Sequence, residues 1–359
     1  MKGLGARPAV GEGRRTELRL PRVLINTGQD GALESPGLPP QRLGSLLGHY
    51  ERVTPPTAVV YRVSCGPHQQ TGVVLEVPVE YYRAGRIKPH EATAADRERR
   101  LLLFTETTGV ERMPVMLAHA PRTALRSLLQ EVTAGPPRLQ RSFADGSVHT
   151  VWVSADPLLS EAVQREASQL ESLYIADGHH RMATAVRYAE RRRQLGPDHP
   201  SAFTMAVLFP SDELRVRGYR RLLRIQPGVS DSEVLTALAA LPVTAWLEAT
   251  TDRFTVPRSV LIGLDNRNYR LWLRGTRGDP RSALDAVLLQ ERVIPGIADK
   301  AVPVPAGREQ IDERVLSLEP HPPTIEQIMA VSDANMLLPP KSTWFDPKVR
   351  PGLIVRELR

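Results

Sequence analysis

The sequence has little cysteine, few aromatic residues and no long apolar run. Its single cysteine, Cys65, excludes an internal disulfide framework and a zinc site built from several cysteines, and it suits a reducing compartment. No apolar stretch approaches the roughly 18 residues that a membrane-spanning helix needs. Gly3, Gly5 and Pro8 stand where a signal peptide would be apolar. We therefore expect a soluble, cytoplasmic protein without a membrane partner.

The remaining composition supports a sizeable, mainly aliphatic core, because 41% of the residues are hydrophobic while only 5% are aromatic. We find no internal repeat of the length that builds solenoids. The formal net charge of +7 comes mostly from arginine. This excess suits phosphate-bearing partners, although a genome rich in G and C also favours arginine.

Strand and helix patterns alternate along the chain and predict an α/β protein with mixed sheets. Residues 1–48 are rich in glycine, proline and arginine and predict an irregular lead-in. Residues 49–225 are expected to form the core, and residues 226–359 a C-terminal α+β portion that closes over the site. Gly66-Pro67 and Asp145-Gly146 predict hairpin turns. Helices are expected at 93–107, 122–132, 157–170, 181–193, 230–241 and 281–290, and single strands at 114–118, 173–175, 203–209, 260–264 and 269–273.

The most informative segment runs from the strand at 173–175 through a polar turn into a helix. Such an arrangement points free backbone N–H groups and the positive end of the helix dipole at one place. Gly178 would let a bulky anion approach the backbone, and Arg181 offers a planar fork for phosphate oxygens. The segment therefore predicts a phosphate site formed by Gly178, His179, His180 and Arg181.

Two other interpretations of this segment remain open. A strand, turn and helix with paired histidines also occurs as a purely structural feature. A zinc site on His179 and His180 is disfavoured, because adjacent residues at a helix start point in different directions and lack the spacing of a two-histidine zinc helix.

Three blocks carry a resemblance to a known family. Asp-Gly-His-His-Arg at 177–181 resembles the nucleotide-phosphate motif of the ParB and sulfiredoxin superfamily, and above all that of SerK-type free-serine kinases. The other blocks are Gly85 to Glu91 with Asp96-Arg97, and Leu338 to Lys348. In this order, over residues 58–358, they resemble the bacterial domain-of-unknown-function family 1015. The chain departs from the pattern at Tyr219, where we expect a histidine, and lacks the N-terminal Pro-Pro-Tyr-Asp-like motif.

The resemblance implies a ParB/sulfiredoxin-like, nucleotide-binding catalytic core at 49–225 and a small-molecule kinase. ATP or ADP would be the donor, with Mg²⁺, and a free hydroxyl amino acid the acceptor, with L-serine giving O-phosphoserine as the first expectation. Glu91 would activate the acceptor hydroxyl as general base. It could equally serve only as a favourable charge at the start of the helix near Thr93. His90 would orient Glu91 or contact the substrate.

Several further residues have two interpretations each. Asp177 could take part in catalysis and hold Mg²⁺, or be the N-cap of the following helix; His180 is a further catalytic candidate. Lys341, Ser342 and Thr343 could bind substrate, as the resemblance implies, or form an exposed loop.

The rival function is a nucleotide-binding switch of the ParB type without catalysis. Nucleic-acid binding is not expected, since interleaved aromatic residues and a reading helix are not evident. The sequence carries no prediction of the oligomeric state.

Overall fold

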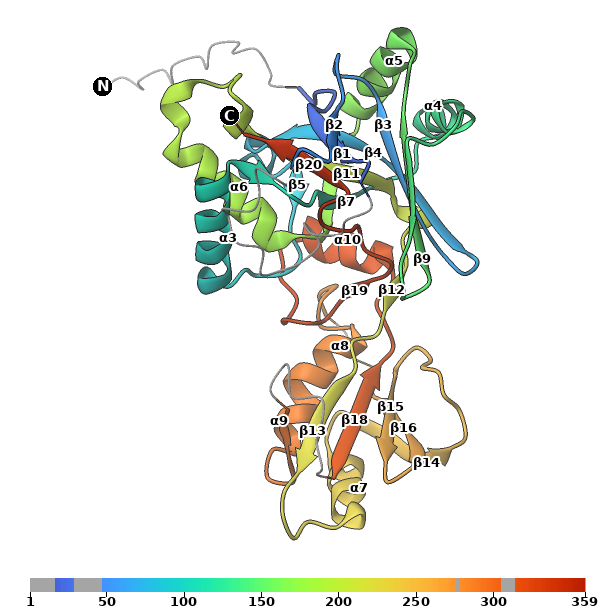
Figure 1. Ribbon diagram of the computed structural model, residues 1–359. Helices are drawn as coiled ribbons and strands as arrows, with labels where there is room; N and C mark the ends of the chain where they lie inside the picture. Colours follow the sequence, from blue (N-terminus) through green and yellow to red (C-terminus); the bar gives the residue numbers. More distant parts are fainter. Residues whose placement is uncertain (1–16, 29–46, 276–277, 305–313, 359) are drawn as a thin grey trace, which may run out of the picture.

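The computed structural model describes residues 17–28, 47–275, 278–304 and 314–358. They form a larger lobe around an eight-stranded mixed sheet and a smaller lobe around a six-stranded antiparallel sheet (Figure 1). Helices and strands alternate along the chain. The predicted α/β class with mixed sheets is therefore confirmed.

The central sheet of the larger lobe contains both parallel and antiparallel pairs. β10 pairs in parallel with β5, and β11 in parallel with β7. All eight residues of β11 are buried, as expected of a strand covered on both faces. The strand order is β5 (Ile87–Lys88), β10 (Leu173–Asp177), β7 (Val115–His119), β11 (Phe203–Pro210), β4 (His68–Pro78), β3 (Val59–Cys65), β9 (Ser147–Val153) and β8 (Leu139–Ser142).

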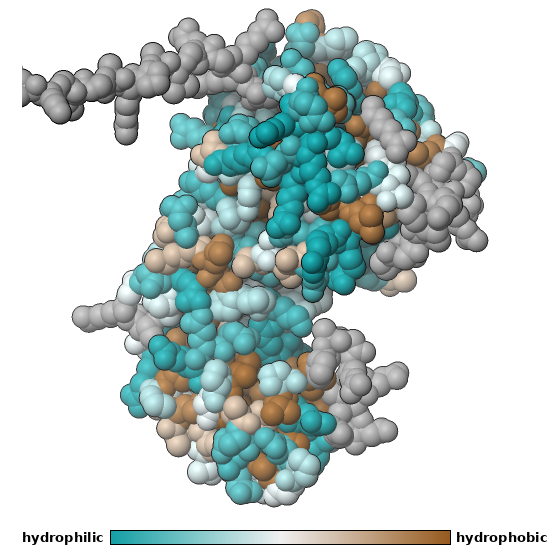
Figure 2. Space-filling model, turned by 90° about the vertical axis from the view of Figure 1, so that its left-hand side faces the viewer, coloured by the Kyte–Doolittle hydropathy of each residue, from teal (hydrophilic) through white to brown (hydrophobic). Residues whose placement is uncertain are grey.

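Helices cover both faces of this sheet. α4 (Thr123–Thr133) and α5 (Pro157–Ser168) place Leu125 and Val163 in the core on one face. α10 (Ile325–Asp333) packs Ile325 and Ile328 against the other face. α3 (Ala95–Thr108) and α6 (His179–Arg191) lie side by side at one end of the sheet (Figure 1). On the face shown in Figure 2, the larger lobe is mostly hydrophilic.

Most predicted local elements are present. β3 and β4 form the first hairpin, and β8 and β9 the second, with Gly66 and Gly146 at positive φ in their turns. The predicted helix at 281–290 is wrong in detail: the chain forms α8 (Asp285–Leu288), a π-helix (Leu289–Val293) and α9 (Ile294–Gly296). α2 spans Glu80–Arg83, and 3₁₀ turns lie at Arg193–Leu195, Pro200–Ala202 and Ser211–Glu213.

A strand lies within the segment for which the sequence predicts irregular structure. β1 (Val23–Asn26) is buried throughout, because three of its four residues are branched and apolar. It pairs with β2 (Tyr50–Arg52) and with β20 (Ile354–Glu357), which also pairs with β6 (Val110–Glu111). Residues 1–16 and 29–46 of the predicted lead-in lie outside the described residues.

The C-terminal strand is fixed in this small sheet by a buried ion-pair network. Arg356 is fully buried. Its Nε atom lies 3.1 Å from Glu76 Oε1, and its Nη1 atom lies 3.0 Å from Glu111 Oε2. Removing one partner of such a network would leave a buried charge uncompensated. The ion pairs thus connect β20 with β6 of the same sheet and with β4 of the central sheet.

The smaller lobe has the strand order β14 (Thr244–Thr250), β16 (Arg267–Leu273), β15 (Ser259–Leu264), β18 (Val315–Pro320), β13 (Arg221–Ile225) and β17 (Ala301–Pro303). α7 (Asp231–Ala240) begins with a capping box of Ser230 and Glu233 and packs on one face of the sheet. After β18 the chain returns to the larger lobe through α10, β19 (Trp344–Phe345), which pairs with β12 (Val216–Arg217), and β20. Within the described ranges, no helix is both long and apolar enough to cross a membrane.

Candidate functional site

The predicted strand, turn and helix are present, and Gly178 is the residue on which they depend. β10 ends at Asp177, Gly178 caps α6 with φ at +106°, and α6 begins at His179, two residues earlier than predicted. A Cβ atom on Gly178 would lie 2.7 Å from the Arg181 Nε atom, so no side chain fits there. The N-cap is therefore Gly178, and the interpretation of Asp177 as the cap is wrong.

Asp177 is instead the centre of a charge network. Its Oδ2 atom accepts from the Arg181 guanidinium, and its Oδ1 atom lies 2.5 Å from Lys348 Nζ. Arg181 also donates to the Pro114 carbonyl at 2.8 Å. Burial opposes ionisation of Asp177, but the charges of Arg181 and Lys348 outweigh it and hold the pKa of the carboxyl below its ordinary value. Because both oxygens already face cations, this arrangement does not fit Asp177 as a magnesium ligand.

His90 and His179 pack edge to face, with ring centroids 4.5 Å apart. The backbone N–H of His90 donates to His179 Nε2 at 3.3 Å, and the ring atom Nε2 of His90 lies 3.0 Å from the Thr343 hydroxyl oxygen. Burial lowers the pKa of His90 to about 4 and that of His179 well below its ordinary value. Both rings are neutral near pH 7, so they join the segments of the site without adding positive charge.

His180 points to the beginning of α3. Its Nε2 atom accepts from the Ala94 N–H at 2.9 Å, and burial lowers the pKa of its ring. The side chain therefore connects α6 to α3, and only its Nδ1 atom is left for another partner.

Glu91 lies in the same cluster. Its backbone forms an isolated parallel bridge with Leu338, and its carboxylate accepts a hydrogen bond from the backbone N–H of Lys341. Burial raises the pKa of the Glu91 carboxyl above its ordinary value; the charge of Asp177 adds to this, while Lys348 and Arg97 oppose it. α3 begins at Ala95 with Ala94 as N-cap and no side-chain cap, so a capping role for Glu91 is not what the structure shows.

The C-terminal block folds back onto this cluster. Leu338 N–H donates to the His90 carbonyl at 2.7 Å, and Thr343 contacts the His90 ring. Ser342 is buried, and its hydroxyl donates to the Pro339 carbonyl at 2.7 Å, so it stabilises the turn and does not face a substrate. Lys341 is exposed, and its Nζ atom lies 5.4 Å from the Tyr219 ring centroid.

Three cationic residues of the site are missing from the sequence-based assignments. Lys348 contacts Asp177. The charge of Arg97 favours the ionised forms of the Asp177 and Glu91 carboxyls and so lowers the pKa of each. The charge of Glu91 in turn opposes the lowering of the pKa of Arg221 by burial. Lys348 and Arg97 stand inside the motif blocks, so the sequence indicates that both lie near the site. What the sequence does not give is the direction of their side chains.

His90, Glu91 and His179 also have the donor types of a transition-metal site, with ligand atoms within 4.8 Å of one another. The sequence suggests only His179 and His180, which are adjacent in the chain, as a histidine pair, and its spacing gives no sign of a grouping with His90 and Glu91. All three side chains already make hydrogen bonds within the protein. We therefore assign no metal to them.

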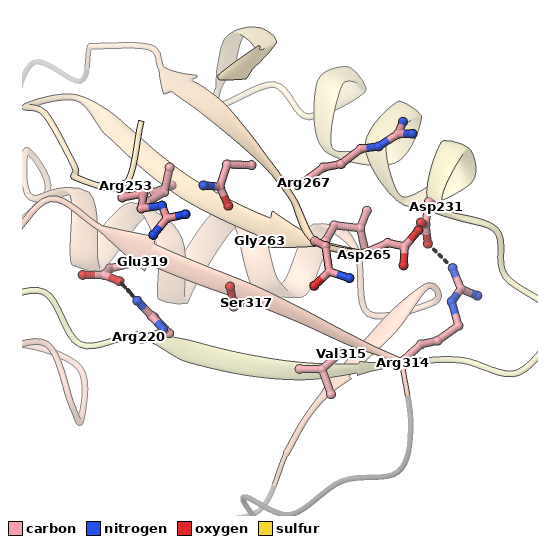
Figure 3. A pocket seen from close by; sticks show the side chains of 14 residues that line it. Arg220, Asp231, Arg253, Gly263, Asp265, Arg267, Arg314, Val315, Ser317 and Glu319 are labelled. Carbon is pink, nitrogen blue, oxygen red and sulfur yellow. Dashed lines mark hydrogen bonds and ion pairs between the residues drawn. The ribbon is translucent and has the colours of Figure 1, made fainter. Parts of the chain in front are cut away.

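A cavity of about 610 Å³ lies elsewhere, on the open face of the sheet in the smaller lobe. No residue of 177–181 lines it. Figure 3 shows two ion pairs among its charged side chains: Arg220 with Glu319, and Arg314 with Asp231. At Gly263 the floor of the cavity is closely packed, since a Cβ atom there would lie 2.6 Å from the Ser317 hydroxyl oxygen.

Comparisons with known proteins give one family and several solved structures. The model of the family described as protein of unknown function (DUF1015) matches residues 50–290. The chain is similar to SbnI with a C-terminal truncation from Staphylococcus aureus, at 13% identity and a TM-score of 0.40, over 78% of this chain and 87% of that one. It is also similar to a mutant free serine kinase in complex with ADP, at 14% identity and a TM-score of 0.36, over 78% and 91% of the two chains. None of the curated proteins matches the chain significantly.

Proposed function

The chain belongs to the DUF1015 family of proteins of unknown function, and we propose that it transfers a phosphoryl group from a nucleotide to the hydroxyl group of a free amino acid. ATP or ADP is the donor and L-serine the first candidate acceptor. The observation that carries the proposal is the meeting of Glu91, the N-terminus of α6 and Lys348 in one cluster, from segments that are far apart in the sequence.

The N-terminus of α6 supplies the groups for phosphate binding. The first intrahelical bond runs from Met182 N–H to the Gly178 carbonyl, so the N–H groups of His179, His180 and Arg181 precede it. These groups and the helix dipole favour an anion. Lys348 and Arg97 add positive charge nearby. A magnesium ion carried by the nucleotide would neutralise part of the phosphate charge.

Arg181 has a second task besides charge. Two of its nitrogens are engaged by Asp177 and Pro114, which fixes the guanidinium beneath Gly178. In this position it stabilises the turn whose N–H groups face the phosphates. Its Nε atom makes no hydrogen bond to the described residues, and we propose it as a direct phosphate donor.

Glu91 is the proposed general base. An ionised carboxylate with a raised pKa is a better proton acceptor than an ordinary one. The carboxylate would take the proton of the acceptor hydroxyl while the hydroxyl oxygen forms the new bond to phosphorus. The bond between that phosphorus and the bridging oxygen breaks, and the nucleotide leaves one phosphate shorter.

The test is release of the shortened nucleotide, ADP from ATP or AMP from ADP, with and without L-serine. We expect release that depends on the amino acid. Tight nucleotide binding without release in the presence of any hydroxyl amino acid would instead favour a nucleotide-binding switch. Absence of nucleotide binding would refute both functions.

A further inference from the structure

A smaller cavity, of about 100 Å³, lies at the end of the central sheet where β7 and β11 finish. These two parallel strands end side by side at His119 and Pro210, and both residues line the cavity. In open α/β sheets, ligands bind outside the carboxyl ends of parallel strands. Because β10 runs antiparallel to β7, Asp177 lies beside Met116, at the other end of β7. The cavity is therefore distinct from the site around Glu91.

The volume of this cavity limits what it could bind. One water molecule needs about 10–15 Å³ of such space, so the cavity holds several waters or one small metabolite. Cavities that hold drug-sized ligands measure roughly 300–1,000 Å³, so a nucleotide would not fit. Leu125 and Leu129 of α4 form an apolar wall together with Pro210. A ligand that fills the space therefore has a short apolar part.

Two opposite charges line the cavity without pairing with each other. Arg62 donates to two threonine hydroxyls, and its guanidinium lies over the Trp152 ring. Glu213 accepts from the Thr71 N–H at 2.7 Å, and its carboxylate lies 3.5 Å from Arg126 Nε. The charges of Arg62 and Glu213 stabilise each other through space, although the two side chains form no ion pair. A ligand that carries both signs of charge would bridge them.

His119 supplies a hydrogen-bond acceptor. Its Nδ1 atom lies 2.8 Å from the Ala120 carbonyl oxygen; because a carbonyl only accepts, Nδ1 carries the proton and Nε2 has a lone pair. Burial lowers the pKa of the ring, which is therefore neutral near pH 7. The residue is only 2% exposed, and its Nε2 atom has no hydrogen-bond partner among the described residues. Since an unsatisfied buried acceptor is unfavourable, a ligand with a hydrogen-bond donor is preferred.

We propose that this cavity binds a small apolar α-amino acid. The carboxylate accepts from Arg62, and the ammonium group, which only donates, contacts Glu213 and His119. The aliphatic side chain packs on Leu125 and Leu129. A phosphate ion suits the cavity less well, because it would face the Glu213 carboxylate and leave the apolar wall uncovered. This site is separate from the proposed phosphoryl-transfer site and does not depend on that function.

Calorimetry with three probes tests the parts of the ligand one by one. The parent should bind L-valine. Isobutylamine lacks the carboxylate and 3-methylbutanoate lacks the ammonium group, so each should bind at least about tenfold more weakly, because each loses a charge-assisted contact. All three probes carry the same branched apolar group, so the comparison isolates the two charges.

Arg62→Met connects the carboxylate to its partner. This variant should bind L-valine at least about tenfold more weakly than the parent and should no longer prefer L-valine to isobutylamine. A merely structural loss would weaken both probes and keep the preference. Arg99→Met is the matched control, since Arg99 is 72% exposed on α3 and pairs with Asp96. It should bind all three probes as the parent does.

Hydrogen exchange of the parent locates the ligand without any variant. L-Valine should slow amide exchange in α4 and at Ser211–Leu214, and should leave Asp177–Arg181 unchanged. No binding of L-valine at millimolar concentration, equal affinity for the three probes, or protection at Asp177–Arg181 without protection of α4 would overturn the proposal. A folded Arg62→Met variant that still prefers L-valine to isobutylamine would overturn it as well. If Arg62→Met does not fold, the probe series and the exchange of the parent decide the question.

Discussion

The two lobes both place arginine beside carboxylates, but in different surroundings. In the larger lobe, Asp177 is 21% exposed and faces both Arg181 and Lys348. In the smaller lobe, Arg220 is 62% exposed and Arg314 54%, each paired with one carboxylate at the mouth of a cavity. Exposed pairs are screened by water and contribute little, whereas a buried charge depends on its partners. The comparison shows that the burial of charged side chains identifies the candidate site better than the volume of a cavity does.

The largest expected effect separates chemistry from binding. Glu91→Gln should lower phosphoryl transfer by about 10² to 10⁴, because a general base acts in the transition state, while nucleotide affinity stays nearly unchanged. Glu319→Gln in the smaller lobe is the control and should leave turnover unchanged. Turnover, calorimetry and melting temperature on the same preparations provide the measurement. Normal turnover of Glu91→Gln would remove Glu91 from the chemistry.

The pH dependence should show the same group. Glu91 works as a base only when it is ionised, and burial raises its pKa above the ordinary 4.5. The rate should therefore fall as the pH drops through that raised pKa, about tenfold per pH unit below it. An acid limb at or below pH 4.5 would contradict the assignment, as would an unchanged limb in Glu91→Gln.

Arg181→Ala should weaken nucleotide binding at least tenfold, since a charge-assisted contact contributes about 1.5–3 kcal/mol. The same change removes partners of Asp177 and of the Pro114 carbonyl, so we also expect a lower melting temperature. Arg220→Ala in the smaller lobe should leave nucleotide affinity unchanged and lower the free energy of unfolding by no more than about 1 kcal/mol. Equal losses in the two variants would abolish the distinction between the lobes.

Lys348→Met tests the smallest effect on the site. Lys348 is 44% exposed, so its pair with Asp177 should contribute less than about 1 kcal/mol to stability. Nucleotide affinity should fall two- to tenfold, by about 0.4–1.4 kcal/mol, if the ammonium also faces phosphate. A melting temperature that falls as far as in Arg181→Ala, with unchanged affinity, would make Lys348 a structural residue only.

The local part of the site could be predicted from sequence, because strand, turn and helix signals at 173–191 come from neighbouring residues. The contacts that complete it could not. Lys348 and Asp177 are 171 residues apart, and His90 and Thr343 are 253 apart; a whole lobe folds between the last two segments. Such contacts depend on the packing of β20 and α10 on the larger lobe, for which local periodicity gives no signal.

The roles of individual side chains were harder to predict than their neighbourhood. His180 turns to Ala94 and Ser342 turns to Pro339, although both lie within motif blocks. In each case a short hydrogen bond to the backbone satisfies the side chain inside the protein. A motif identifies where a site lies, and the hydrogen-bond partners decide which of its residues remain free for a ligand.

The most direct test of the central claim, that Glu91 and the N-terminus of α6 form one phosphoryl-transfer site, is ³¹P NMR of the protein incubated with nucleotide, Mg²⁺ and L-serine. We predict a new phosphomonoester signal from O-phosphoserine, formed together with the shortened nucleotide and absent with Glu91→Gln. A phosphomonoester signal of equal size from Glu91→Gln, or none from a parent that binds nucleotide, would contradict the account.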